Sequence, residues 1–483
     1  MTTFAVIKKT KIMYIKRIFI IICIIIVTLL AVALLATRKV DRTSYYECDY
    51  YKQSIAQLES LRKNSVAIHH SFAAGFSKVS ITPELNCSED NIAEGKFKNV
   101  PLAGYGSREG KFAAGVNDSI FIRAAAVQVA DQLMVIVGAD LLIMPHNITD
   151  TVLSMLHRDG IGRDQLMFSA THTHSSIGGW GIGTIGSKFA GTPNENMVRW
   201  LASRITLAVR TAIKDLKPAL IGSGNVPAAS YTRNRILGDL GTKNDDFSYI
   251  VLEQIEGKKA VIGSFSAHAT TIREEIMEIS GDYPGYWSRA MESAFADCAI
   301  FCAGGVGSQA TQTVGGENFE RAQKYAHVLA DTVTKCIAAT PMDDSVIFSA
   351  ITMKLNLPDF NIRILKNRSL ISKLSNKMLP APKYPVLQAM RLNDMIWVSA
   401  PSDFSGEIAL QTKNYLYSKG FNANVIGFNG SYVGYIIPSK YFFLDRFAGG
   451  MGLYESRTMG WFGPNMGDYT ADLIRQLSEI VIR

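Results

Sequence analysis

Two histidines separated by one residue form the sharpest chemical motif in the chain. They stand in Thr171-His172-Thr173-His174, directly after the apolar run LMFSA. In an extended segment residues i and i+2 point to the same face, so both imidazoles can reach one ion or one substrate oxygen. Neutral imidazole is a common zinc ligand, and a catalytic Zn²⁺ keeps one of its four positions open for water. Two ordinary hydrogen-bonded histidines remain the alternative.

Other polar residues follow apolar runs in the same way. Asp140 follows LMVIVGA, His268 follows SFSA, and Asp403 follows IWVSAPS. In α/β folds ligands gather where the carboxyl ends of the strands leave the sheet. If these strands are neighbours, we expect the side chains to meet the histidine pair in one cavity. Two structural alternatives stay open, since His268 can be a hydrogen-bonded core histidine and Asp403 can be the N-cap of a following helix.

Apolar runs alternate with amphipathic stretches along the whole body of the chain. This alternation predicts an α/β fold with mixed β-sheets flanked by helices. Hydrophobic periodicity predicts helices over residues 196–216, 317–338 and 406–418. Short apolar runs predict strands over residues 133–138, 166–170, 219–222, 260–267, 299–303 and 395–400.

The N-terminus reads as a membrane segment. Residues 18–36 are IFIIICIIIVTLLAVALLA, without a charge, and a helix of this length nearly crosses a hydrocarbon core of about 30 Å. Five bases precede it, which predicts a cytoplasmic tail over residues 1–17 and a single-pass signal-anchor with the catalytic domain outside the cytosol. A cleavable signal peptide, with Ala31-x-Ala33 as its cleavage site, is the alternative. Residues 37–71 are polar and predict a stalk that is helical in part, around residues 51–63, leaving residues 72–483 as the catalytic domain.

Charge and cysteine content exclude several functions. Residues 1–42 contain eight bases and one acid, so they carry most of the net charge of +8, and the remainder is nearly neutral. No nucleic-acid partner is therefore expected. The six cysteines include no CxxC pair, which argues against a zinc–thiolate site and leaves one disulfide open. The glycines of residues 304–307 lack the Lys-Ser/Thr of a phosphate-binding loop.

The order of motifs over about residues 75–468 resembles the neutral (non-lysosomal) ceramidase family. The Thr-His-Thr-His segment corresponds to the family's HTHS-G-PGG segment. The other matching segments are FSKVSITPEL, PLAGYGSREG, VNDSIFIRAAAV, TRNR, FSAHATTI with ISGDYPGY, FCAGGVGSQAT, APSDFSGEI, and SYVGYIIP with LYES.

The resemblance implies a zinc site and assigns its ligands. His172 and His268 take the places of the family's histidine ligands, and Asp403 stands where the family has a glutamate. Tyr435 corresponds to the tyrosine at the metal. His174 and Arg235 take roles beside the metal, where they polarise the scissile carbonyl and stabilise its oxyanion.

The chain also departs from the family pattern. Ala310 occupies the position of an active-site serine, and the neighbouring Ser308 is a candidate replacement. The chain ends shortly after LYES, so the expected fold is the catalytic domain without the C-terminal β-sandwich domain.

The sequence therefore predicts a zinc-dependent hydrolase that cleaves the N-acyl amide bond of ceramide or a related lipid amide with metal-activated water. Two alternatives remain. One is the same metal chemistry on a different amide or ester, and the other is a catalytically inactive, membrane-tethered binding protein.

Overall fold

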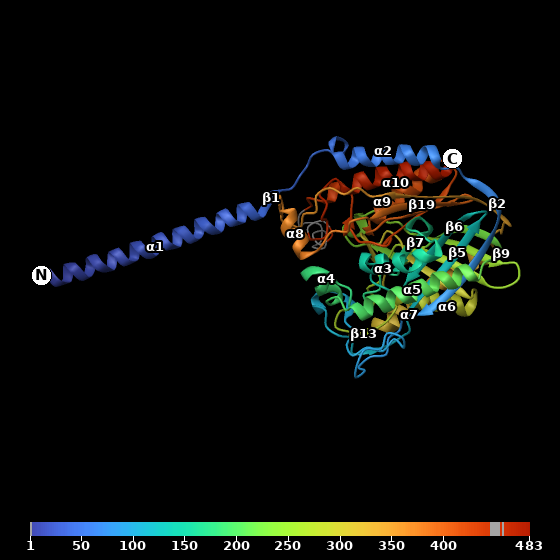
Figure 1. Ribbon diagram of the computed structural model, residues 1–483, viewed down its shortest axis with the longest axis horizontal. Coiled ribbons are helices and arrows are strands. Elements are labelled where there is room, and N and C mark those ends of the chain that lie inside the picture. Colours follow the sequence, from blue (N-terminus) through green and yellow to red (C-terminus); the bar gives the residue numbers. More distant parts are fainter. Residues whose placement is uncertain (1, 445–454, 456–457) are drawn as a thin grey trace.

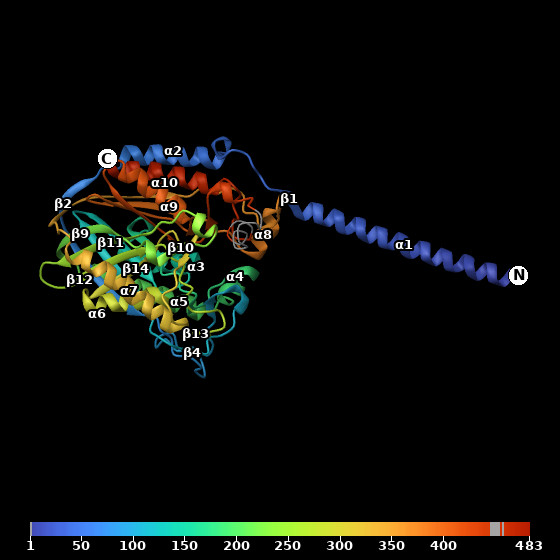
Figure 2. The same ribbon diagram turned by 180° about the vertical axis from the view of Figure 1, so that it is seen from behind.

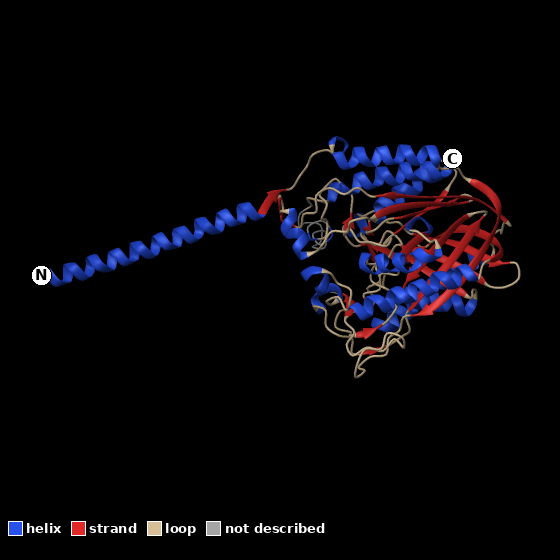
Figure 3. Ribbon diagram, in the orientation of Figure 1, coloured by secondary structure: helices blue, strands red, loops and turns tan. Residues whose placement is uncertain are grey.

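The computed structural model describes residues 2–444, 455 and 458–483. A long helix, α1 (Thr2–Ala36), projects from a body in which helices surround the strands (Figures 1 and 3). Residues Met13–Ala36 of α1 are long and apolar enough to cross a membrane, and none of this stretch is buried against the body.

A sheet of twelve strands organises the body. Nine strands form one path, in the order β14-β12-β11-β9-β2-β16-β19-β20-β22, and β5, β6 and β7 branch from β2. The β12–β14, β20–β22 and β6–β7 pairs are parallel, and the other neighbours are antiparallel. Their bounds are β2 Ile68–Ser80, β5 Phe121–Val129, β6 Gln132–Ala139, β7 Leu166–Ala170, β9 Lys217–Pro227, β11 Asp246–Gln254, β12 Lys259–Phe265, β14 Cys298–Ala303, β16 Ser345–Lys354, β19 Val386–Leu392, β20 Met395–Ser399 and β22 Asn422–Ile426.

The long strand β2 joins the two parts of this sheet. Its first residues, from Ile68 to Ser71, pair with β16, and Phe72 to Ser80 pair with β5. Apolar side chains from both parts meet in one buried cluster, which contains Ile136 of β6, Ile300 of β14 and Trp397 of β20. Such strands, buried on both faces, explain the continuous apolar runs in the sequence.

Helices cover the outer faces of the sheet in three groups. α3 and α5 pack beside β2, β5 and β6; α6 and α7 cover the β11–β12–β14 region; α9, α10 and α2 cover β16, β19, β20 and β22 (Figures 1 and 2). The bounds are α2 Asp49–Asn64, α3 His146–Leu156, α4 Gly183–Ala190, α5 Glu195–Lys214, α6 Asp282–Ala294, α7 Asn318–Ala338, α8 Ser372–Met378, α9 Gly406–Tyr417 and α10 Met466–Ile482.

The predicted fold class, mixed sheets flanked by helices, is confirmed. Each predicted strand overlaps an observed one, and residues 166–170 coincide with β7. The helix predicted over residues 196–216 is α5, which begins after Asn194 because that side chain accepts from the N–H groups of Asn196 and Met197. It ends before the Lys217-Pro218 pair, where proline disfavours the helical conformation of the residue before it.

The segment predicted as a stalk packs against the body instead. β1 (Thr37–Lys39) pairs with β18 (Arg368–Leu370), which also pairs with β17 (Arg363–Leu365). The predicted helix around residues 51–63 is α2, and it packs on α10: the Tyr51 hydroxyl donates to Asp472 at 2.9 Å, and Leu58 is buried. The polar composition reflects the solvent face of α2, while its few apolar side chains face α10.

Short strand pairs lie around the carboxyl ends of the main strands. β3 (Leu102–Gly104) pairs with β8 (Ser175–Ile177), β10 (Thr232–Asn234) with β15 (Gln309–Thr311), β4 (Gly115–Val116) with β13 (Glu278–Ile279), and β21 (Asp403–Phe404) with β23 (Tyr435–Ile436). All six cysteines lie among the described residues, and none is in a disulfide.

Candidate metal centre and active site

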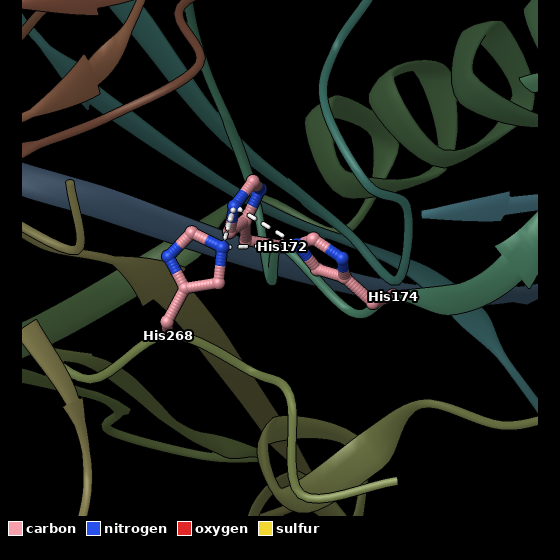
Figure 4. A group of neighbouring side chains, drawn as sticks. All are labelled: His172, His174 and His268. Carbon is pink, nitrogen blue, oxygen red and sulfur yellow. Dashed lines mark hydrogen bonds between the residues drawn. The ribbon is translucent and has the colours of Figure 1, made fainter. Parts of the chain in front are cut away.

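Three histidines from two neighbouring regions point their imidazoles at one another (Figure 4). His172 and His174 follow β7, and His268 follows β12. The Nε2 atom of His268 lies 2.9 Å from Nε2 of His172 and 3.0 Å from Nε2 of His174, and the third Nε2–Nε2 distance is 3.4 Å. These residues form a group that could hold a metal ion. The structure thus brings together the two histidine segments singled out in the sequence.

Hydrogen bonds at the opposite ring nitrogens fix two of the imidazoles. The Nδ1 atom of His172 lies 2.7 Å from the carbonyl oxygen of Leu142, and Nδ1 of His268 lies 3.2 Å from that of Val306. A carbonyl oxygen only accepts, so each Nδ1 carries the proton and each Nε2 has a lone pair. Two lone pairs facing each other at 2.9 Å repel unless a cation lies between them. Metal-bound histidines almost always have such a second hydrogen bond.

Asp403 adds a negative oxygen to this group. Its Oδ2 accepts from the Tyr432 hydroxyl at 2.6 Å, and its Oδ1 lies 3.1 Å from Nε2 of His172. That Oδ1 atom is buried and has no hydrogen-bond partner among the described residues. The alternative role as an N-cap is not observed, because Ser405 caps α9 by accepting from the N–H of Glu407. Asp403 therefore presents an unsatisfied carboxylate oxygen to the histidines.

The geometry suits a zinc ion. Around a tetrahedral Zn²⁺ with Zn–N distances of about 2.0–2.1 Å, ligand atoms lie about 3.3 Å apart, close to the distances within this group. A proton on His174 or His268 is disfavoured as an alternative to a metal ion between the rings. Burial, followed by the positive charge of nearby groups, lowers the pKa of His174 and of His268 well below the ordinary histidine value. Both imidazoles are thus neutral near pH 7, the form that binds metal.

His174 differs from the other two histidines. Its Nδ1 is buried and has no hydrogen-bond partner among the described residues, so no acceptor fixes which nitrogen carries the proton. Its backbone is held firmly, because Arg108 donates to its carbonyl oxygen at 2.6 Å. Gly104, with a φ of +137°, lies so close that a Cβ there would be 2.3 Å from the same oxygen. A larger residue at this position would displace His174.

The two neighbouring histidines do not meet through an extended strand. β7 ends at Ala170, and His172 has a φ of +62°, in the left-handed region that non-glycine residues rarely adopt. Its ring stacks on Phe428, with centroids 4.4 Å apart, and Phe428 also has a positive φ. The i, i+2 spacing therefore correctly predicted that the two imidazoles meet, but it assumed an extended backbone that His172 does not have. Strained residues of this kind concentrate at functional sites.

Arg235 and Tyr435 lie beside the histidine group. Nη2 of Arg235 donates to the Tyr435 hydroxyl at 3.1 Å and contacts Glu455 at the same distance. Burial alone would lower the pKa of Arg235, but the nearby Tyr435 and Glu455 outweigh it and raise that pKa, so the guanidinium stays charged. The β21–β23 pair places Tyr435 directly opposite Asp403.

The structure places Ser308 apart from the histidines' cavity. Its hydroxyl accepts from the N–H of Gly406 at 2.9 Å, at the start of α9, and Ser308 does not line the pocket described below. Ala310 forms a β-bridge with His268. In the LYES segment Leu453, Tyr454 and Ser456 lie outside the described residues, while Glu455 is described.

Asp140, the other polar residue predicted at a strand end, does not join the histidines. Its Oδ2 accepts from Nη1 of Arg123 at 3.1 Å and from the N–H of Phe121 at 2.9 Å. Nε of Arg123 in turn donates to Glu292 of α6 at 2.6 Å. This buried ionic cluster ties β5 and β6 to α6.

An apolar pocket ends at the histidine group. Its cavity volume is about 110 Å³. His172, His174, Asp403 and Tyr435 form its polar end. Much of the remaining lining is apolar, including Leu142, Ile143, Ile185, Phe189, Leu379 and Trp461.

Sequence reasoning missed the residues that support the site. Tyr432 stands in the segment NGSYVGY, where an aromatic residue is normally a strand or turn residue, yet its hydroxyl donates to Asp403. Arg108 and Gly104 lie in the PLAGYGSREG segment, but nothing in the sequence pairs them with His174. The one signal available was the glycine itself, because a glycine within a strand, as Gly104 is in β3, often marks a close backbone approach.

Comparisons with known proteins agree with this architecture. Residues 89–351 match the family described as neutral/alkaline non-lysosomal ceramidase, N-terminal. The crystal structure of neutral ceramidase from Pseudomonas aeruginosa superposes with a TM-score of 0.70 at 18% identity, covering 86% of this chain and 75% of that chain. A ceramidase complexed with C2 gives the same TM-score and coverage at 17% identity. A search of curated proteins finds no match.

Proposed function

The chain belongs to the neutral/alkaline non-lysosomal ceramidase family, and from this premise we propose that it is a zinc-dependent hydrolase of the N-acyl amide bond of ceramide or a related lipid amide. Family membership supports a ceramide hydrolase in general terms. The metal, the roles of individual residues and the membrane topology are the parts that we propose.

One observation carries the proposal: the Nε2 atoms of three imidazoles and a buried carboxylate oxygen face each other at distances of 2.9 to 3.4 Å. We assign the metal ligands as His172, His268 and Asp403, with Tyr435 beside them. His172 and His268 have the second hydrogen bond that fixes a ligand's tautomer. A zinc ion at this position supplies Lewis acidity, which polarises a carbonyl group and lowers the pKa of water.

The remaining polar groups suit the other needs of amide hydrolysis. His174 can exchange protons because no hydrogen bond at Nδ1 among the described residues fixes its tautomer, and its pKa is lowered into the range where it is neutral. Arg235 stays charged and orients the Tyr435 hydroxyl, so that this hydroxyl and the guanidinium can stabilise the oxyanion formed at the carbonyl. Ser308 stays a weaker candidate, because its hydroxyl is engaged with Gly406.

The pocket favours a lipid substrate over a polar amide. Its apolar lining, which includes Leu142, Ile185, Phe189 and Trp461, can bury an acyl chain, while the histidines stand at its polar end. Burial of such a chain is favourable by about 0.8 kcal/mol for each methylene group. A small polar amide would gain little from these walls.

We also propose that α1 is retained as a membrane anchor. Its apolar residues from Met13 to Ala36 are exposed, and bases precede them on the N-terminal side. The charge bias places residues 1–17 in the cytoplasm and the body outside it. Detection of Met1–Arg17 peptides in the mature membrane-bound protein tests retention, and a chain that begins near residue 34 would contradict it.

The proposed activity is tested by metal analysis of the purified full-length chain and by fatty-acid release from ceramide in detergent. We expect one zinc per chain and release that stops on chelation and returns with zinc. Zinc without release from ceramide would keep the metal site and contradict the substrate. A folded chain that takes up no zinc when it is supplied would contradict the proposed chemistry.

A further inference from the structure

The end of the apolar helix is fixed directly to one face of the body. α1 ends at Ala36 and β1 begins at Thr37, with no residue between them. The N–H of Ile371 donates to the carbonyl oxygen of Ala36 at 3.1 Å, and Arg368 donates to the Thr37 hydroxyl at 2.7 Å. Whatever surrounds the end of α1 must therefore lie against the face that contains β18.

This face has an unusual composition. We call residues 363–384, which contain β17, β18, α8 and the loop that follows, the α8 face. It has six bases and no acid, in a chain whose residues 43–483 are nearly neutral overall. Lys373, Lys377 and Lys383 are exposed. Large apolar side chains are exposed among them, with Leu365 at 54% and Tyr384 at 75%.

The same segment forms a wall of the substrate pocket. Leu379 and the three residues after it line the pocket, and the carbonyl of Met378 accepts from the Thr184 hydroxyl of α4 at 3.3 Å. α4 contributes Ile185 and Phe189 to the pocket. Both views place α8 and α4 on the side of the body from which α1 extends (Figures 1 and 2).

We propose that the α8 face rests on the surface of an anionic lipid bilayer, so that the pocket receives its lipid from the membrane and not from water. Lysines attract the negative lipid headgroups, and the exposed apolar side chains enter the boundary between headgroups and acyl chains. This inference extends the proposed anchor and substrate, because it states which surface of the body faces the lipid. The short connection between α1 and β18 makes this contact the geometrically simplest arrangement.

The contact can be measured without turnover. The full-length chain, with its non-buried cysteines (Cys23, Cys48, Cys87, Cys336) replaced by serine, receives an environment-sensitive fluorophore at Leu365→Cys or Met378→Cys. It is reconstituted into phosphatidylcholine–phosphatidylglycerol vesicles, recovered by flotation, and compared with and without spin-labelled phosphatidylcholine. We expect several-fold stronger quenching at these two positions than at Ile255→Cys. Equal quenching at all three positions would overturn the proposal.

Ile255 is a suitable control because it is exposed in the turn before β12. His268 follows the other end of β12, so this turn lies at the opposite edge of the sheet, about 23 Å from the site by the rise of a seven-residue strand. The lysines supply a second measurement. The triple variant Lys373→Glu, Lys377→Glu and Lys383→Glu should lower hydrolysis of ceramide in anionic vesicles on the order of tenfold, and leave hydrolysis in detergent unchanged.

The matched control replaces three exposed lysines elsewhere by glutamate, which reverses the same number of charges. These are Lys63 in α2, Lys214 in α5 and Lys335 in α7. Equal losses in both triple variants would overturn the role of the α8 face. Failure of this inference is distinguishable from failure of the proposed function, because quenching needs no catalysis and detergent hydrolysis needs no bilayer. A chain that hydrolyses ceramide in detergent but shows no preferential quenching keeps its function and loses this orientation.

Discussion

Two buried polar clusters stand at the ends of neighbouring strands, and they differ in one respect. β6 and β7 are parallel neighbours, with Asp140 directly after the first and His172 shortly after the second. In the cluster around Asp140, the Arg123 guanidinium donates to both Asp140 and Glu292, so each of these acidic groups has a positively charged partner. Around His172 the Nε2 atoms of three imidazoles and a carboxylate oxygen of Asp403 meet. The first cluster pairs its charges within the protein, and for the second we propose that a cation is the partner.

The largest difference between the clusters should appear when a histidine is removed. His268→Ala should abolish stoichiometric zinc binding and lower the rate of amide hydrolysis on the order of a thousandfold or more, because a ligand and its lone pair are lost. His172→Ala should do the same. Zinc per chain, measured by elemental analysis, decides this. The control is His146→Ala, which changes a histidine that lines the same pocket outside the group. Full zinc occupancy in His268→Ala would remove that residue from the site.

The ionic cluster should respond in the opposite way. Arg123→Met leaves the Asp140 carboxylate buried without its charged partner, while Glu292 keeps its ion pair with Lys78, so it should lower the free energy of unfolding by about 3–5 kcal/mol. Zinc per chain should not change. Denaturant unfolding and metal analysis of the same preparation test both statements. Zinc loss in a folded Arg123→Met chain would show that the two clusters are coupled.

Arg235 should affect turnover and spare the metal. Arg235→Ala removes the donor that holds the Tyr435 hydroxyl, so kcat should fall roughly 10²–10³-fold with zinc retained. Arg233→Ala is the matched control, because Arg233 lies two residues away in β10 and is exposed. Unchanged kinetics in Arg235→Ala would refute the role proposed for the guanidinium.

Variants of Asp403 and Ser405 should distinguish the proposed metal ligand from the helix cap, although the two residues are only two positions apart. Asp403→Asn should lose zinc with little change in the thermal stability of the metal-free chain. Ser405→Ala should keep zinc and lower the free energy of unfolding by about 1 kcal/mol, because it removes the hydrogen bond to the N–H of Glu407. Retention of zinc in Asp403→Asn would exclude that carboxylate as a ligand.

The smallest expected effect is a pH dependence of stability in the metal-free chain. The pKa values of His174 and His268 are lowered in the fold, so below about pH 6.5 the unfolded chain binds protons that the folded chain does not. The free energy of unfolding should therefore have its full value above that pH, and it should become smaller as the pH falls below it. His174→Gln should flatten this dependence, and His70→Gln, at an exposed position, should not. An unchanged pH dependence of the free energy of unfolding in His174→Gln would contradict a lowered pKa of His174 in the folded chain.

The sequence predicted the elements and the participants better than their arrangement. Apolar runs located β7, β12 and β20 because strands buried on both faces leave a continuous signal. Local motifs likewise indicated His172, His268 and Asp403. The left-handed backbone of His172, the Tyr432 contact with Asp403 and the completion of Asp140 by Arg123 depend on residues far apart in sequence. No local pattern reports such partners.

Residues 37–71, predicted as a stalk, show again that local sequence does not reveal distant partners. Polar composition over residues 37–71 is equally typical of a solvated spacer and of an amphipathic helix with one apolar side. Leu58 and the Ser54 hydroxyl, which bonds to the Tyr469 hydroxyl at 2.8 Å, show that α2 belongs to the body. The partner helix lies more than 400 positions later in the chain, beyond the reach of any periodicity.

That pairing of α2 with α10 has a consequence for how the protein is made. α2 (Asp49–Asn64) is synthesised long before its partner, Met466–Ile482. Until α10 is made, α2 lacks this partner, and a long loop must close before the contact forms. A chain interrupted before α10 would therefore expose the apolar side of α2 next to its membrane segment, where chaperones and proteases recognise incompletely folded chains. The contact between α2 and α10 can therefore form only after the residues between them have been synthesised.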